Sequence, residues 1–237
     1  MIPVLLIAGN VIREQRWPVI FLVLWCAVIA AAYSFSYDVE LVQNDFVFLL
    51  GQQALYAVGF SAFVSSFSLH NELRSRRILG VLSKAIARGQ YLAGLLLGVC
   101  ACSTLYCAAI VLSSVWIARG LAFSAVQFAW LAVVLVAACL LTAAMALFFS
   151  TLLNPLPATA ATAFLIALPA VLALALGDAW ARVIPVYAIT SAVLRFSFDA
   201  AWAPGAGVLA LALAESVAFW LAASWTFAHR DIAVAVE

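Results

Sequence analysis

The sequence predicts an all-α integral membrane protein with six transmembrane helices. Of the 237 residues, 68% are hydrophobic and 9% are charged, and the mean hydropathy is +1.19. Soluble domains carry roughly 25% charged residues, so this composition is typical of a chain that lies in lipid. A hydrocarbon core of about 30 Å is crossed by roughly 20 apolar residues of helix, and six runs of that kind follow one another here. We expect residues 1–237 to form a single membrane domain with no soluble domain.

The first element is a short N-terminal helix that we expect to lie in the membrane interface. Residues 4–17 are too few to span, and apolar side chains recur at helical spacing until Asn10, Arg13, Glu14 and Arg16 enter. No basic residue precedes the apolar stretch and no small-residue cleavage site follows it. A cleaved signal peptide is therefore not expected.

Six long apolar runs and one weaker segment make up the rest of the chain. The weaker segment, 179–198, contains Arg182, Pro185 and Arg195 among aromatic residues, whose rings favour the headgroup level. We expect a re-entrant or interfacial element there, before the sixth helix. The six predicted transmembrane helices occupy residues 18–35, 46–69, 90–117, 123–149, 157–177 and 205–228.

Lysine and arginine are distributed unevenly between the two ends of these helices. With six spans both termini lie on the same side, and an excess of cations in short loops marks the cytoplasmic side. A cytoplasmic N-terminus places eight cations inside and three outside, so we predict that both termini are cytoplasmic. The inner set is Arg13, Arg16, Arg74, Arg76, Arg77, Lys84, Arg88 and Arg230, and the outer set is Arg119, Arg182 and Arg195.

The motifs give no support to nucleotide binding or catalysis by this chain. A Walker A loop ends in Gly-Lys-Ser/Thr, whereas the only lysine, Lys84, lies between Ser83 and Ala85. The two histidines, His70 and His229, lie at predicted helix ends without an HExxH or GxSxG motif. The five cysteines lie in apolar runs and are interpreted as small core residues. We expect no enzyme activity, no cofactor and no metal in this chain, and its net charge of +1 gives no reason to expect a nucleic-acid partner.

Two polar features inside the predicted helices are candidate functional residues. Glu215, near the middle of the last helix, is the only charged residue within the six runs. An acid in lipid is energetically costly, so Glu215 either lines a pathway or packs against polar groups of neighbouring helices, and packing is slightly favoured. In the second helix a polar stripe follows steps of three and four residues and therefore lies on one face. Its members are Gln52, Tyr56, Gly59, Phe63 and Ser66.

Small and polar residues are ordinary packing material between membrane helices, so packing is the favoured interpretation of this stripe. A substrate path or a contact between subunits is the alternative. Gly94 and Gly98 form a GxxxG motif at the start of the third helix, which predicts a close contact with another helix.

The segment between the second and third helices holds five of the eleven cations within fifteen residues. Its sequence from Asn71 to Gly94 is NELRSRRILGVLSKAIARGQYLAG, in which apolar residues are interspersed with the cations. A short amphipathic helix at the inner membrane surface would bury the apolar residues and leave the cations in water or at lipid headgroups. A solvated positive loop is the alternative.

The residue order in this segment resembles the cytoplasmic loop of the type-two ABC exporter permeases. That loop has a glutamate, an apolar helix ending in Leu-Ser-Lys-Pro, an arginine, and then Tyr-Leu and Gly. The matching residues are Glu72, Leu82, Ser83, Lys84, Arg88, Tyr91, Leu92 and Gly94. Six spans, an N-terminal interfacial helix and a charged end, FAHRDI at 227–232, extend the resemblance over the whole chain. Ala85 stands where the family commonly has proline, which leaves open whether a helix ends after Lys84.

The resemblance implies that this segment carries a cytoplasmic coupling helix, which binds a separate ATPase subunit and transmits its closure to the spans. Two permease chains, identical or related, would face each other in a bacterial cytoplasmic (inner) membrane. Two ATPase subunits beneath them would bind ATP and Mg. The implied coupling residues are Glu72, Arg76, Arg77, Leu82, Ser83, Lys84 and Arg88. The alternative functions are an ion-coupled carrier or channel, and a non-transporting membrane scaffold or immunity-type protein.

Overall fold

The computed structural model describes residues 2–35, 43–74, 87–120, 124–177 and 202–229. In these ranges the chain forms helices and no strand. The helices are α1 (Ile2–Glu14), α2 (Arg16–Phe35), α3 (Gln43–Arg74), α5 (Arg88–Ile117), α6 (Ala125–Leu152), α7 (Pro155–Leu176) and α10 (Trp202–His229), with a single 3-10 turn, η1 (Ala118–Gly120), after α5.

These helices confirm an all-α integral membrane protein. Among the described residues, α2, α3, α5, α6 and α10 each contain a stretch long and apolar enough to cross a membrane. The predicted fifth span falls on α7, where the apolar stretch Pro155–Leu168 is shorter. The weaker segment predicted at 179–198 lies outside the described residues. The six-span topology therefore stays a prediction.

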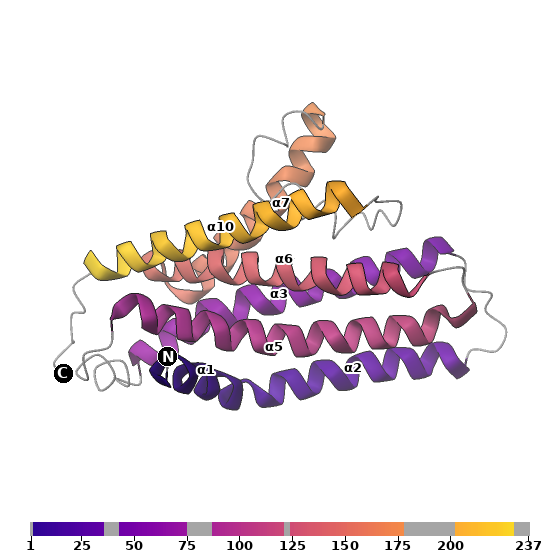
Figure 1. The fold of residues 1–237 in the computed structure, drawn as a ribbon, viewed down its shortest axis with the longest axis horizontal. Helices are drawn as coiled ribbons and strands as arrows, with labels where there is room; N and C mark the ends of the chain where they lie inside the picture. Colours follow the sequence, from indigo (N-terminus) through magenta and orange to yellow (C-terminus); the bar gives the residue numbers. More distant parts are fainter. Residues whose placement is uncertain (1, 36–42, 75–86, 121–123, 178–201, 230–237) are drawn as a thin grey trace.

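The long helices lie side by side along one axis, and α7 tilts away from the others towards its C-terminal end (Figure 1). α6 is central, since it packs against α3, α5, α7 and α10 and 72% of its apolar stretch is buried. α2 is peripheral, with only 11% of its stretch buried. The start of α1 and the ends of α3 and α10 lie at the same end of the bundle as the start of α5 (Figure 1).

Local sequence explains where several helices begin and end. Ser124 and Gln127 form a capping box at the start of α6, in which each residue bonds the backbone N–H of the other. α6 ends where Pro155 follows, because proline cannot donate the next helical hydrogen bond and suits the first turn of α7. α7 ends at Gly177, whose φ of +88° favours glycine.

The inner face of α3 carries small residues that allow it to approach α6 closely. Ser61 Oγ donates to the Cys139 carbonyl at 2.7 Å, and Ser65 Oγ donates to the Ala143 carbonyl at 2.7 Å. These two bonds tie α3 to α6 in the buried interior. The buried inner face comprises Leu50, Ala54, Ala57, Ser61, Ser65, Ser68 and Glu72.

Ser61→Ala and Ser65→Ala should each lower the stability of the detergent-solubilised protein. Interhelical side-chain bonds in membranes contribute about 0.6 kcal/mol on average, so the double variant should lose roughly 1 kcal/mol. Ser68→Ala is the matched control, because Ser68 Oγ bonds the Val64 carbonyl of its own helix. Reversible unfolding in mixed micelles measures the change. Equal losses in all three single variants would mean that the α3–α6 bonds add nothing beyond side-chain volume.

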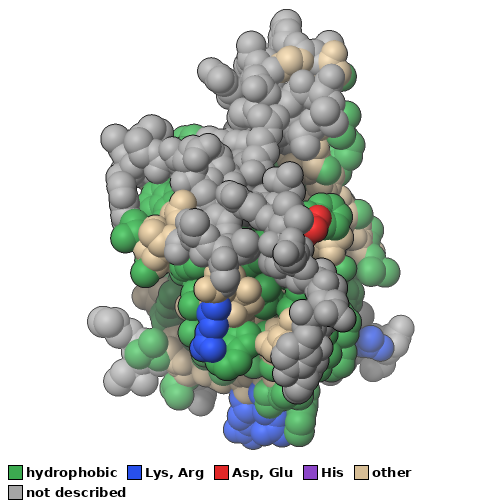
Figure 2. Space-filling model, turned by 90° about the vertical axis from the view of Figure 1, so that its right-hand side faces the viewer, with side chains coloured by type: hydrophobic (Ala, Val, Ile, Leu, Met, Phe, Trp, Pro, Cys, Tyr) green, Lys and Arg blue, Asp and Glu red, His purple; other side chains and the backbone are tan. Residues whose placement is uncertain are grey.

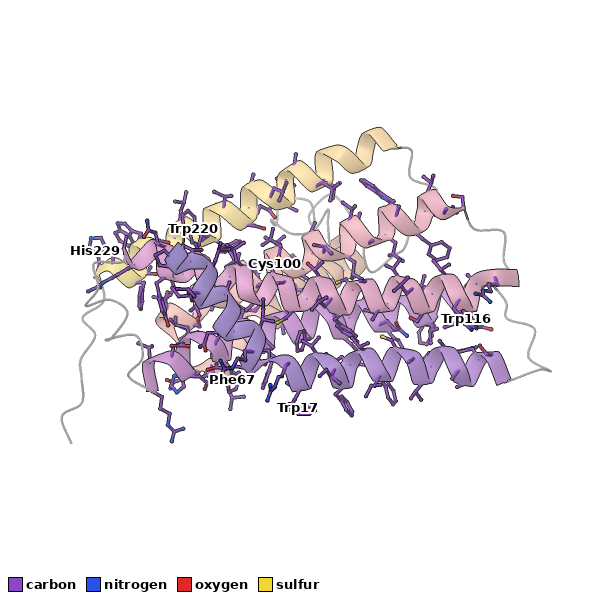
Figure 3. The ribbon with its side chains drawn as sticks, turned by 60° about the horizontal axis from the view of Figure 1, so that its bottom comes forward. Trp17, Phe67, Cys100, Trp116, Trp220 and His229 are labelled. Atoms are coloured by element: carbon purple, nitrogen blue, oxygen red, sulfur yellow. The ribbon has the colours of Figure 1, made fainter. Side chains whose placement is uncertain are left out.

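The opposite end of the bundle is held by aromatic contacts and carries little charge among the residues that the structure describes. Trp116 Nε1 donates to Ser34 Oγ at 2.7 Å, which joins the ends of α5 and α2. The guanidinium of Arg119 lies over the Trp116 ring, 3.6 Å from its centroid. Figure 3 shows Trp116 at this end. Figure 2, which looks onto it, shows mostly hydrophobic side chains and only scattered charged groups among the residues described.

The cysteines occupy packing positions, as predicted. Cys26, Cys102, Cys107 and Cys139 are buried, Cys100 is half-buried, and all five thiols are free. Cys107 Sγ and Cys139 Sγ lie 3.7 Å apart across α5 and α6. They act as small residues in the core where these central helices meet.

Candidate functional site

The candidate site is the end of the bundle where α3 and α5 flank segment 75–86. Glu72 lies in the last turn of α3, and Arg88 is the first residue of α5. Ala87 has an extended backbone (φ −62°, ψ 138°), so the chain is not helical immediately before Arg88 despite the alanine at position 85. Five of the predicted coupling residues lie outside the described residues: Arg76, Arg77, Leu82, Ser83 and Lys84.

Glu72 is buried within the chain rather than displayed to a partner. α3 continues five residues beyond its predicted apolar run, which places Glu72 on the same face as Ser61, Ser65 and Ser68, and only 6% of its surface is exposed. Asn10 Nδ2, from α1, donates to Glu72 Oε1 at 3.2 Å. A buried carboxylate is costly unless it accepts hydrogen bonds, so this bond helps to fix the end of α3 against α1.

Arg88 joins the start of α5 to the end of α10. Its Nη1 donates to the carbonyls of Phe227 at 2.8 Å and Ala228 at 2.9 Å. The guanidinium also lies over the Phe227 ring, 5.9 Å from the centroid. The last carbonyls of a helix have no intrahelical partner and carry partial negative charge, so a guanidinium satisfies both their bonding and their charge. Thr151 on α6 and Thr226 on α10, whose hydroxyls lie 2.8 Å apart, add a contact between α6 and α10 near this end.

Gly94 and Gly98 form the predicted close helix contact, and its partner is α1. A Cβ built on Gly94 would lie 2.8 Å from Ile7 Cβ, and one built on Gly98 would lie 2.6 Å from Val11 Cβ and 2.9 Å from the Ala8 carbonyl oxygen. Real Cβ atoms essentially never approach so closely, so only glycine fits. Figure 3 shows α1 lying across α5 at an angle to α2.

These contacts place both ends of segment 75–86 on other helices. The α3 end is bonded to α1 through Asn10, and the α5 end is bonded to α10 through Arg88. Sequence reasoning missed Asn10 as a site residue. The available signal was an amide side chain in an otherwise apolar stretch of α1, because such a group needs a partner when it packs against another helix.

The polar stripe of α3 divides into an exposed part and a buried part. Gln52, Tyr56, Gly59 and Phe63 are exposed in this chain, with Tyr56 54% exposed and no atom within 4 Å of a Cβ built on Gly59. Ser66 is fully buried. Ser66 is therefore the member of the stripe that packs inside this chain, and the roles of the other four stay predictions. We name the four exposed residues the outer face of α3. The buried glutamine is the neighbouring Gln53, whose Oε1 lies 3.9 Å from Cys26 Sγ.

Glu215 is half-buried on α10, one residue before the buried Ser216. It lies on a different helix from the outer face of α3. Its position beside the buried face of α10 suits either of the roles that its sequence context left open.

Glu215→Gln should leave the protein folded and alter transport. The amide keeps the shape and hydrogen-bonding capacity of the side chain but cannot carry charge or exchange a proton. The measurement is substrate transport in vesicles at matched protein levels, with Asp45→Asn, at an exposed acid in the first turn of α3, as the control for loss of a negative charge. Transport at the wild-type rate in Glu215→Gln would remove Glu215 from the candidate pathway.

Comparison of the chain with protein-family models, curated proteins and solved structures found no match.

Proposed function

We propose that this chain is the transmembrane permease subunit of an ABC exporter that is driven by a separate ATPase subunit. The observation that carries the proposal is the residue order from Glu72 to Gly94 in a chain that has no Walker A loop. The contacts at the two ends of segment 75–86 support it. A segment that transmits force must be held firmly where it joins the membrane domain, and Glu72 and Arg88 are both held by other helices.

In this proposal α2, α3, α5, α6, α7 and α10 are the six spans, and α1 is the interfacial helix. Arg74 ends α3 and Arg88 begins α5, and these helix ends share one end of the bundle with the start of α1 and the end of α10 (Figure 1), which supports a cytoplasmic location for that end in the inner membrane. Segment 75–86 is then the cytoplasmic coupling segment. Two ATPase subunits would contact it and bind ATP and Mg.

The outer face of α3 is the proposed contact with a second permease chain, or the wall of a substrate path between the two chains. A polar Gln52 and a half-exposed Tyr56 are poorly suited to lipid, and Gly59 permits the close approach of another helix. The nearly uncharged spans favour an apolar or amphipathic substrate.

Copurification tests the proposal. The tagged chain, expressed with the proteins encoded beside its gene, should bring down a protein with a Walker A motif, and the complex should hydrolyse ATP faster than that ATPase alone. A tag on an unrelated six-span protein is the control. A chain that purifies without any such partner would contradict the proposal and favour a self-sufficient carrier or channel, or a scaffold.

A further inference from the structure

We infer that Asn10 is a positioning residue for coupling, through which α1 controls the end of α3 that leads into segment 75–86. The inference rests on the proposed function. It assigns a role in energy transfer to the first helix, which would otherwise serve only as an anchor at the membrane surface.

The hydrogen-bonding chemistry of Asn10 is the first step. Its amide has two donor hydrogens, and Nδ2 lies 3.2 Å from Glu72 Oε1 and 3.3 Å from Glu14 Oε1. Both donors therefore have carboxylate acceptors. One carboxylate lies on α1 itself and the other is the buried group at the end of α3, so Asn10 ties the two helices together with charge-assisted bonds.

The fixed position of α1 is the second step. Gly94 and Gly98 let α1 approach α5 so closely that Ile7 and Val11 lie where a side chain at either position would begin, and this close packing holds α1 against α5. A fixed α1 holds Asn10 in place, and Asn10 holds Glu72. Since the bond to Glu72 is already 3.2 Å long, a displacement of either helix by a fraction of an ångström weakens it.

The location of Glu72 is the third step. Arg74, two residues later, is the last residue of α3, and the coupling segment follows it directly. A movement of that segment pulls on the Asn10–Glu72 bond before it reaches the buried serines further along α3. Loss of the bond should let the end of α3 yield, so that ATP hydrolysis continues with less movement of the spans.

A double-mutant cycle tests this role. Asn10→Leu removes both donors at nearly constant volume, and Glu72→Met removes the acceptor. In the purified complex, Asn10→Leu should lower the amount of substrate moved per ATP about tenfold, the factor expected for one hydrogen bond to a charged group. In the Glu72→Met background Asn10→Leu should change this ratio less than twofold, because the bond is already absent. Asn154→Leu is the control, because Asn154 is exposed and its side chain caps no N–H.

Two further readouts separate this role from simpler ones. Copurification with the ATPase, measured first, should be equal for all variants, and its failure in the wild type would overturn the proposed function rather than the role of Asn10. Trypsin cleavage after Arg74 reports opening at the end of α3 without any ATPase, and Asn10→Leu should accelerate it. The inference would be overturned if Asn10→Leu accelerated cleavage but left the amount of substrate moved per ATP unchanged. It would also be overturned if Asn10→Leu lowered that amount equally in the wild-type and Glu72→Met backgrounds. If Asn10→Leu does not yield folded protein, Asn10→Ala makes the same comparison.

Discussion

Gly98→Leu is expected to destabilise the protein more than any other glycine substitution in the described helices. The new side chain would begin 2.6 Å from Val11 Cβ and 2.9 Å from the Ala8 carbonyl oxygen. Backbone atoms cannot move aside as a flexible side chain can, so α1 must leave α5. Inserting side-chain volume into a packed interior costs about 1–3 kcal/mol. For a chain of this size that cost lowers the melting temperature by roughly 2–4 °C per kcal/mol. Thermal unfolding in detergent, followed by tryptophan fluorescence, measures the change.

The matched control is Gly9→Leu, which makes the same replacement in a helix where no atom lies within 4 Å of the new Cβ. Leucine has a higher helix propensity than glycine, so Gly9→Leu should be neutral or slightly stabilising. Gly94→Leu should fall close to Gly98→Leu, because its Cβ would lie 2.8 Å from Ile7 Cβ and 3.0 Å from the Val4 carbonyl oxygen. Equal stability of Gly98→Leu and Gly9→Leu would show that α1 does not pack on α5 through these glycines.

The sequence predicted the helices well because long apolar runs and helical spacing leave few other folds in a membrane. Four of the six runs lie wholly within a helix, and the described parts of the runs 123–149 and 157–177 extend beyond α6 and α7 by one residue each. The main misjudged boundary was the end of α3, where hydropathy falls at His70 while the helix continues to Arg74. Hydropathy reports the preference for lipid, whereas a helix needs only helical backbone bonds. Hydropathy therefore assigned Glu72 to the loop, whereas in the structure Glu72 is a buried residue of α3.

The candidate site was less predictable, because it depends on which helices meet. GxxxG correctly predicted a close contact, but the motif does not specify a partner, and α1 was expected at the membrane surface. Gln52 and Gln53 are neighbours in the sequence, yet Gln52 is exposed and Gln53 is buried. Which of the two glutamines is buried depends on how α3 is rotated about its own axis. Because the neighbouring residues are small, the sequence pattern does not determine that rotation.

Arg88→Met is expected to have the second-largest effect, because it removes two bonds from a guanidinium to the end of α10. Hydrogen bonds to charged groups contribute about 1.5–3 kcal/mol, so the variant should lose stability of that order. The matched control is Arg119→Met at the opposite end of α5, where the guanidinium lies over the Trp116 ring. An exposed contact of that kind contributes roughly 0.5–1 kcal/mol. Unfolding in mixed micelles measures both variants, and similar losses would mean that the carbonyl bonds of Arg88 contribute little.

Arg88→Lys separates the two roles that Arg88 could have in a transporting complex. If its positive charge pairs with an acidic group of the ATPase, lysine should restore most of the coupling between ATP hydrolysis and transport. If Arg88 acts by holding α10, lysine should behave like methionine, because a single ammonium lacks the planar fork of donors that reaches the Phe227 and Ala228 carbonyls together. We expect the second result, with coupling and stability lost in parallel. Recovery of coupling in Arg88→Lys without recovery of stability would instead place the charge of Arg88 at the ATPase interface.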